Sequence, residues 1–151
     1  MALPIDPTLL TDDDIGEESA ILEMEHEEAI EFVRECCEQT GFGIPVEFSP
    51  SELLNEKVDA DRDPYYVLGA CNPRMADRAL TGSEKKIGAL FPCNMIIWEM
   101  EPGRQKVYHV SIMRIARLVG MAPDNEEWQQ IVDETGDLVD DCFERIEAEA
   151  V

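Results

Sequence analysis

The sequence predicts an α+β domain whose elements follow the order β-α-β-β-β-β-α. Several short stretches alternate between apolar and polar side chains, which is typical of strands with one buried face. Two longer segments instead repeat apolar residues at the spacing of one helical face. A chain of 151 residues has the length of one domain. We therefore expect an antiparallel sheet with the helices packed mainly on one face.

The first half of the domain is predicted as strand, helix, strand. A strand begins at Ala20, and a helix follows over about residues 27 to 40, where Gly41 ends it. Residues 42 to 48 alternate again, but Pro45 cannot donate a ladder hydrogen bond. This strand is therefore expected at a sheet edge or a bulge.

The middle of the chain holds a short helix over residues 50 to 57, an acidic connector and a strand over residues 65 to 71. Asn72 is a favourable N-cap, and Pro73 suits the first position of a short helix that runs to Leu80.

The second half continues with a strand over residues 93 to 100, and the Pro102-Gly103 turn joins it to a partner strand over residues 105 to 112. A short helix is expected over residues 113 to 119. The last helix runs from about residue 124 to about residue 148, and its buried stripe includes Trp128 and Thr135.

Residues 1 to 17 are predicted to form an acidic, mobile leader, because they contain two prolines, three consecutive aspartates and little apolar material. Residues 18 to 151 then form the single α+β domain. The apolar stretches are too short to span a bilayer, and the N-terminus lacks the features of a signal peptide. Five cysteines without framework spacing fit reduced thiols. Together these observations predict a cytoplasmic protein.

The charge is strongly acidic, with 34 Asp and Glu against 12 Lys and Arg, a net charge of −22. Such a charge opposes folding in dilute buffer, whereas molar salt shortens the Debye length to about 3 Å. We interpret this balance as adaptation to the salty cytosol of a halophile. The lack of a basic face also disfavours binding to nucleic acid.

Two cysteine-asparagine pairs, Cys71-Asn72 and Cys93-Asn94, each lie at the end of an apolar strand. The thiols could form a redox pair, a persulfide site or a metal site, or they could be small buried hydrophobes. We favour the last interpretation, because neither thiol has a neighbouring base. A zinc site would need a third ligand such as His109, and no zinc spacing is present. The thiols are expected to be reduced and buried or nearly so, with neither metal nor cofactor.

The polar neighbours of the two thiols complete the candidate ligand or thiol site. Asn94 lies inside an apolar strand, where a buried amide needs partners or a ligand. His109 lies on the partner strand, and it is expected to be structural or solvated, because no acidic partner is fixed. The site therefore comprises Cys71, Asn72, Cys93, Asn94 and His109, and none of them is assigned a catalytic role.

The segment LGACNP, the short helix after it and the segment LFPCN resemble the family of domains of unknown function numbered 302. The resemblance runs from about Glu18 to Ile146. It implies a small TBP-like α+β domain, usually a homodimer, and no established reaction. The acidic leader and His109 depart from the motifs of the family.

The strand over residues 93 to 100 is apolar on both faces, yet helices of a two-layer fold cover only one face of a sheet. We therefore expect a homodimer without enzymatic activity that acts as a small-molecule binding or interaction module. One alternative is a thiol-dependent redox or sulfur-handling protein that uses Cys71 and Cys93. A nucleic-acid-linked regulator is a third hypothesis by fold analogy alone.

Overall fold

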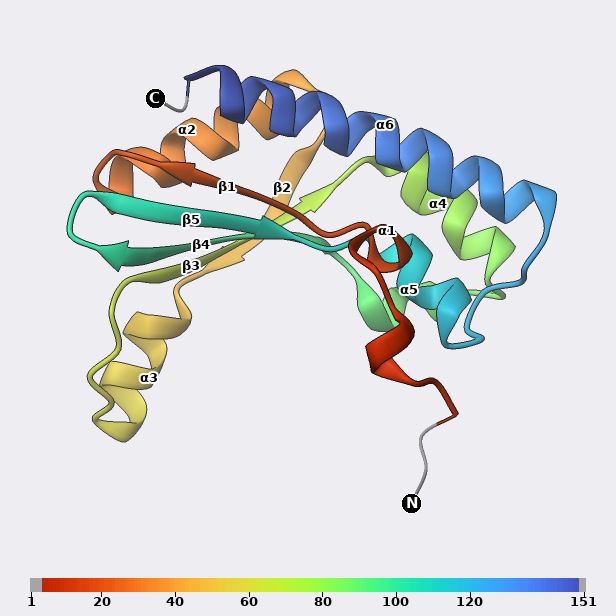
Figure 1. Ribbon diagram of the computed structural model, residues 1–151, viewed down its shortest axis with the longest axis horizontal. Coiled ribbons are helices and arrows are strands. Elements are labelled where there is room, and N and C mark those ends of the chain that lie inside the picture. The colour runs from red at the N-terminus through yellow and green to blue at the C-terminus, as the bar shows by residue number, and fades with distance from the viewer. Residues whose placement is uncertain (1–3, 150–151) are drawn as a thin grey trace.

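The computed structural model describes residues 4–149, and it is built around one five-stranded antiparallel sheet (Figure 1). The order across the sheet is β1-β5-β4-β3-β2. The strands are β1 (Glu18–Leu22), β2 (Gly43–Phe48), β3 (Tyr65–Cys71), β4 (Cys93–Glu101) and β5 (Arg104–His109). The strand order along the chain and the antiparallel sheet confirm the predicted α+β class.

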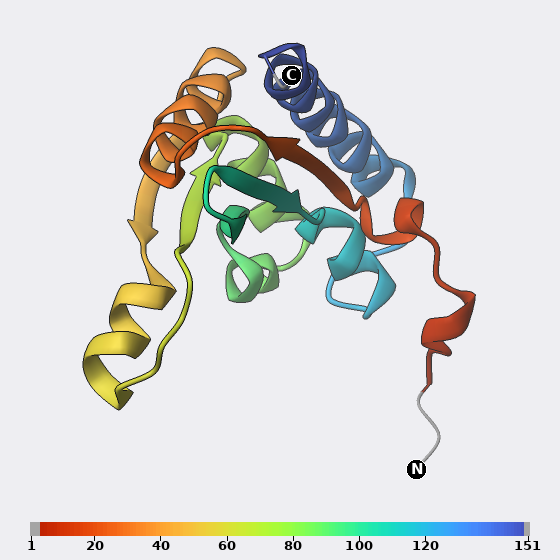
Figure 2. The ribbon, with the colours of Figure 1, turned by 60° about the vertical axis from the view of Figure 1, so that its left-hand side comes forward.

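The two longest helices, α2 (His26–Gln39) and α6 (Glu126–Glu149), lie side by side over one face of the sheet (Figures 1 and 2). Helices α4 (Pro73–Gly82) and α5 (Ile112–Leu118) pack against α6 at one end. Helix α3 (Pro50–Val58) projects away from the opposite side of the sheet. The shorter elements are η1 (Pro7–Leu9), α1 (Asp12–Ile15) and η2 (Lys86–Leu90).

Strand β2 lies at the edge of the sheet, as its proline predicts. Within residues 4–149 it pairs only with β3, and the register shifts between Gly43 and Val46, on either side of Pro45. A proline is tolerated there because an edge strand leaves one row of N–H groups unpaired and a bulge interrupts the ladder. The edge position and the bulge are both confirmed.

The core consists of two clusters of buried apolar residues. The first lies between the sheet and helices α2 and α6, and includes Leu22, Val33, Leu68 and Ile97. The second lies among α4, η2, α5 and α6 around Trp128, whose indole N–H donates to the Met113 carbonyl at 2.9 Å. Because α6 contributes to both clusters, it ties the sheet to the helices at its end.

Strand β5 is shorter than predicted, and this expectation is corrected. It ends at His109, and Ile112 already belongs to α5. The cause is Ser111, whose hydroxyl accepts a hydrogen bond from the Arg114 N–H and thereby caps α5. The expected alternation holds up to that point, with Val107 and His109 buried on the helix-covered face.

The described residues of the acidic leader contact α5. The Ile15 carbonyl accepts from the Ser111 N–H, and the Asp13 carbonyl accepts from the Arg114 guanidinium, both at 2.7 Å. The mobility of the leader stays a prediction, and residues 1–3 of it lie outside the described residues. No helix within residues 4–149 is long and apolar enough to cross a membrane.

Candidate functional site

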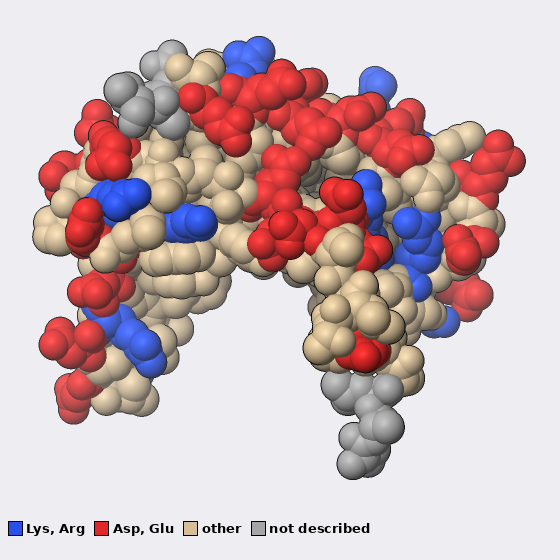
Figure 3. Space-filling view, viewed as in Figure 1, with Lys and Arg blue, Asp and Glu red and all other residues tan. Residues whose placement is uncertain are grey.

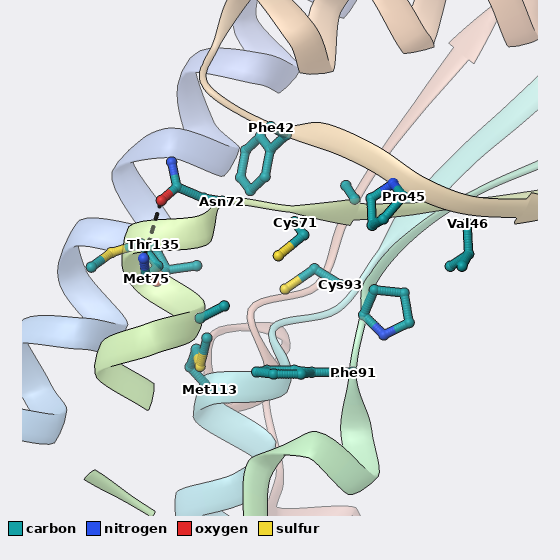
Figure 4. A pocket seen from close by; sticks show the side chains of 13 residues that line it. Phe42, Pro45, Val46, Cys71, Asn72, Met75, Phe91, Cys93, Met113 and Thr135 are labelled. Atoms are coloured by element: carbon teal, nitrogen blue, oxygen red, sulfur yellow. Dashed lines mark hydrogen bonds between the residues drawn. The ribbon is translucent and has the colours of Figure 1, made fainter. Parts of the chain in front are cut away.

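An apolar cavity of about 250 Å³ lies at the end of the sheet, where β2, β3 and β4 meet helices α4, α5 and α6 (Figure 4). It lies between the two core clusters, because its wall takes residues from each of them. The lining residues are Phe42, Pro45, Val46, Ala70, Cys71, Asn72, Met75, Ala76, Phe91, Pro92, Cys93, Met113 and Thr135.

Two thiols from neighbouring strands contribute to this wall. Cys71 is the last residue of β3, and Cys93, the first residue of β4, pairs with Ala70 in the antiparallel register. Figure 4 shows both sulfur atoms directed toward the cavity from adjacent positions. Strand pairing therefore brings together two cysteines that are 22 positions apart in the sequence.

Asn72 fixes the corner between β3 and α4. Its side-chain oxygen accepts from the Met75 N–H at 3.1 Å, and its amide nitrogen donates to the Gly41 carbonyl at 2.9 Å. The first bond confirms the predicted N-cap. The second bond ties α4 to the turn before β2. Asn72 therefore lines the cavity as a structural residue, with both ends of its amide already bonded.

Gly69 allows the chain to close over the sheet beside the cavity. A Cβ atom at this position would lie 2.6 Å from side-chain atoms of Pro92 and Val46, and 2.9 Å from the Val46 carbonyl oxygen. Contacts this short with backbone cannot be relieved by moving a flexible side chain. The glycine in the LGAC segment therefore permits Val46 and Pro92 to form one wall of the cavity.

The cavity wall contains no charged residue, although more than a fifth of the chain is Asp or Glu. The wall does contain one unpartnered polar atom, the hydroxyl oxygen of Thr135, which belongs to a side chain only 5% exposed. A buried hydroxyl without a partner costs about 1–3 kcal/mol. The wall is therefore suited to an uncharged, largely apolar occupant.

Cys71 and Cys93 are each partly buried rather than fully enclosed. The cause is the open side of the cavity, which leaves both thiols at its wall. Burial and the neighbouring Cys71 raise the pKa of Cys93 to about 12. At neutral pH Cys93 is therefore a protonated thiol and a weak nucleophile.

Asn94 and His109 do not line the cavity. Asn94 is exposed, which corrects the expectation of a buried amide: strand alternation places its side chain on the face opposite the helices. His109 is buried beneath α6, where its ring lies 6.4 Å from that of Phe143 and its Nδ1 is 3.0 Å from the Asn94 carbonyl oxygen. Burial lowers its pKa, so the imidazole is neutral and structural.

A second cysteine pair, Cys37 and Cys142, lies in the core between α2 and α6. Their sulfur atoms are 3.8 Å apart, and both side chains are almost completely buried. The hydrogen bond with Cys142 and burial raise the pKa of Cys37. The void beside this pair is only about 10 Å³. Within residues 4–149, no group of three or more His, Cys, Asp or Glu is placed to hold a metal ion.

Sequence reasoning missed most of the wall, notably Phe42, Phe91, Met113 and the role of Thr135. Thr135 carried a usable signal, because it is a hydroxyl within the apolar stripe of α6. The aromatic and methionine residues gave no such signal in the sequence, because their spacing fits ordinary core packing equally well.

The comparisons with known proteins agree with this fold. The family model described as "Domain of unknown function DUF302" matches residues 19–146. A crystal structure of an uncharacterised conserved DUF302 protein from Bacillus stearothermophilus is similar over 85% of this chain and 96% of that chain, with a TM-score of 0.72 and 24% identity. No functionally curated protein matches the chain. Because the family model spans most of the chain, the protein belongs to the DUF302 family.

Proposed function

We propose that the protein is a binding module for a small, uncharged and largely apolar molecule, which occupies the cavity at the end of the sheet. The observation that carries this proposal is the cavity of about 250 Å³ with an uncharged wall. An engineered apolar cavity of about 150 Å³ is large enough to bind benzene. Drug-sized ligands need about 300 Å³ or more, so the expected ligand is smaller than these.

Thr135 supplies the polar contact that orients this ligand. Its hydroxyl lacks a partner within the described residues, whereas the amide of Asn72 is already bonded at both ends. A ligand with one hydroxyl or carbonyl group satisfies Thr135 and leaves its apolar body against Phe42, Phe91 and Met113. Ligand specificity then depends on one hydrogen bond and on the shape of an apolar wall.

Binding is favoured over thiol-dependent catalysis because of the environment of Cys93. A thiol enzyme activates its cysteine with a base or a nearby cation. Here burial raises the pKa of Cys93 to about 12, and the cavity wall contributes neither histidine nor a charged side chain. The thiol-dependent alternative therefore requires an activating group that the described wall does not supply.

Nuclear magnetic resonance of the isotopically labelled protein tests the proposal directly. Toluene and benzyl alcohol, an apolar probe and its hydroxyl-bearing relative, are titrated while backbone amide shifts are followed. We expect saturable shifts centred on β3, β4 and α4, with benzyl alcohol the tighter ligand. Ala76→Phe fills the cavity and should abolish the shifts, whereas Ala148→Phe on the exposed side of α6 should leave them unchanged. Shifts that persist in Ala76→Phe would contradict the proposal.

We also propose that the module is a homodimer formed through the face of the sheet opposite α2 and α6, here called the open face. Three cross-strand rows on this face contain no Asp or Glu. These rows are Phe48-Val67-Ile96-Tyr108-Ser19, Tyr65-Trp98-Lys106-Ile21 and Val46-Gly69-Asn94. The rings of Tyr65 and Trp98 stack with their centroids 6.0 Å apart. An apolar surface this broad is typical of an interface.

A second copy is the partner that this surface fits best. Figure 3 shows acidic side chains along the helix-covered side, and mostly uncharged atoms in the hollow below the sheet between α3 and residues 4–17. An identical copy offers the same three rows without Asp or Glu, which pair with themselves about a twofold axis. Light scattering at high salt should give twice 17.0 kDa, and Trp98→Glu should give one copy. A monomeric parent protein would refute this interface.

The acidic surface supports a third element of the proposal, adaptation to a cytoplasm with molar salt. The net charge is −22, and five cysteines without the spacing of a disulfide framework also fit a reducing compartment. Screening at molar salt reduces repulsion among the carboxylates, so the free energy of unfolding should rise with KCl. Thermal unfolding between 0.1 and 3 M KCl measures this effect. A melting temperature independent of salt would count against halophilic adaptation.

A further inference from the structure

We infer that Cys71 and Cys93 form a binding site for one soft monovalent cation of the Cu(I) class. The site uses the wall of the same cavity, but the inference goes beyond the proposed apolar ligand and does not require it. The donors are the two thiolate sulfurs at the facing ends of β3 and β4.

The strand pairing brings these sulfurs together. Cys93 is paired with Ala70, and Cys71 follows Ala70 at the very end of β3, where the side chains of both cysteines line the cavity. Figure 4 shows the two sulfurs as neighbours at the centre of the wall. Asn72 holds the end of β3 through its bonds to Gly41 and Met75, so the position of Cys71 is fixed by a bonded corner. The pair is therefore preorganised on two strands of one sheet.

The chemistry of the wall selects a soft ion. Thiolate and thioether donors favour Cu(I), whereas carboxylates and water favour hard divalent ions. The wall offers two thiols and the thioethers of Met75 and Met113, and it contains no Asp, Glu, His or Lys. Zinc needs four ligands in a structural site, and no three-residue His, Cys, Asp or Glu group is placed to supply them within residues 4–149. A two-sulfur site therefore suits an ion that accepts low coordination.

The proton balance gives the inference a distinctive signature. Both thiols must lose their protons, so one Cu(I) and two thiols form a bis-thiolate complex of charge −1 and release two protons to solvent. No electrons are exchanged, and the ion stays Cu(I). The apparent affinity should therefore increase about 100-fold for each unit of pH, as two protons per ion require.

The test uses the reduced full-length protein under anaerobic conditions, with potassium sulfate as the salt because chloride complexes Cu(I). Competition with the chromophoric chelator bicinchoninate measures affinity and stoichiometry. One Cu(I) per chain is expected. Cys71→Ser and Cys93→Ser should each weaken binding by at least about 100-fold. Loss of a residue that only supports a metal ligand already weakens binding by up to about 100-fold, and these cysteines are the ligands themselves. Cys142→Ser removes a thiol from the core and should change the affinity by less than about threefold.

The outcomes separate this inference from the proposed function. Equal affinity in Cys71→Ser and the parent protein, loss of the site only in Cys142→Ser, or binding without release of two protons would each overturn the copper site. Circular dichroism identifies any variant that fails to fold, and the pH dependence of the parent protein tests the inference without a variant. Toluene binding without Cu(I) binding would contradict the copper site but not the proposed apolar ligand. Cu(I) binding without toluene binding would remove only the apolar ligand.

Discussion

The two cysteine pairs of this protein lie in regions with opposite properties. Cys37 and Cys142 join α2 to α6 in the core, with their sulfurs 3.8 Å apart and a void of only about 10 Å³ beside them. Cys71 and Cys93 lie at the wall of a cavity of about 250 Å³ and are half-buried. The same functional group therefore packs as a small hydrophobe in one region and faces an open volume in the other.

The difference shows that space and neighbours decide the role of a thiol. In the core, packed side chains such as Phe42 and Val139 surround the small void beside the cysteine pair. At the cavity, the chain closes over the sheet through Gly69 and Pro92 but leaves a volume that packing does not fill. A thiol that contacts an unfilled volume can exchange its neighbours for a ligand, whereas a thiol in a filled core cannot.

The largest expected difference between the two pairs is in their rates of alkylation. Cys71 and Cys93 should react with iodoacetamide about 1000-fold faster than Cys37 and Cys142, because the core thiols require an opening that costs several kcal/mol. Cys71 should react before Cys93, since burial raises the pKa of Cys93 to about 12. Mass spectrometry of the native protein over time measures each rate. Equal alkylation rates for both pairs would show that the core and the cavity wall leave their thiols equally accessible.

Replacement of single cysteines should separate the two regions by stability. Cys142→Ser introduces a hydroxyl into the packed core and should lower the free energy of unfolding by about 1–3 kcal/mol. Cys71→Ser, at the half-buried wall, should cost less than about 1 kcal/mol. Urea unfolding at 3 M KCl compares the two variants under matched conditions. A larger loss for Cys71→Ser would show that the cavity wall is the more tightly packed region.

The two regions also differ in charge, which predicts a pH dependence. Burial and the hydrogen bond with Asp140 raise the pKa of Glu18 to about 8 at the edge of the core, whereas the cavity has no carboxylate. The folded state therefore holds a proton that the unfolded state has lost, so stability should fall as pH rises from 6.5 toward 8. This pH range lies at or above the ordinary histidine pKa of 6.5. Protonation of the buried His109 therefore contributes little to the change in stability.

Glu18→Gln removes this titration and tests its origin. The free energy of unfolding of this variant should change less between pH 6.5 and 8 than that of the parent protein. At pH 8 the variant should be the more stable of the two, because Asp140 loses a like-charged neighbour. Glu23→Gln, an exposed carboxylate that follows the same strand, is the matched control and should keep the slope of the parent protein. An unchanged slope in Glu18→Gln would assign the pH dependence to other carboxylates.

The smallest expected effect concerns the cavity alone. Thr135→Val removes the unpartnered hydroxyl and should raise the free energy of unfolding by about 0.5–1 kcal/mol in the absence of ligand. The same change should weaken benzyl alcohol more than toluene, because only the alcohol can bond to the hydroxyl. Thermal unfolding and titration of both probes measure these effects. Destabilisation by Thr135→Val would mean that the hydroxyl already has a partner in solution.

Much of the fold could be predicted because it depends on local patterns. Alternation located the strands, and Pro45 placed β2 at an edge because proline cannot donate in a ladder. Asn72 was predicted as a cap from its position before Pro73, and the structure confirms its bond to Met75. The same reasoning failed at Ser111, because an alternating pattern does not show where a capping side chain will end a strand.

The candidate site was likewise predictable only in part. By itself the sequence determined that Cys71 and Cys93 end apolar strands and that the surface is strongly acidic, because strand periodicity and charge are properties of local sequence. Only the tertiary structure decided which side chains share a volume. It joined Thr135 to the thiols and excluded Asn94 and His109, because contacts between distant segments depend on how the sheet and helices pack. A cavity is the space that this packing leaves, and no pattern in the chain encodes its position.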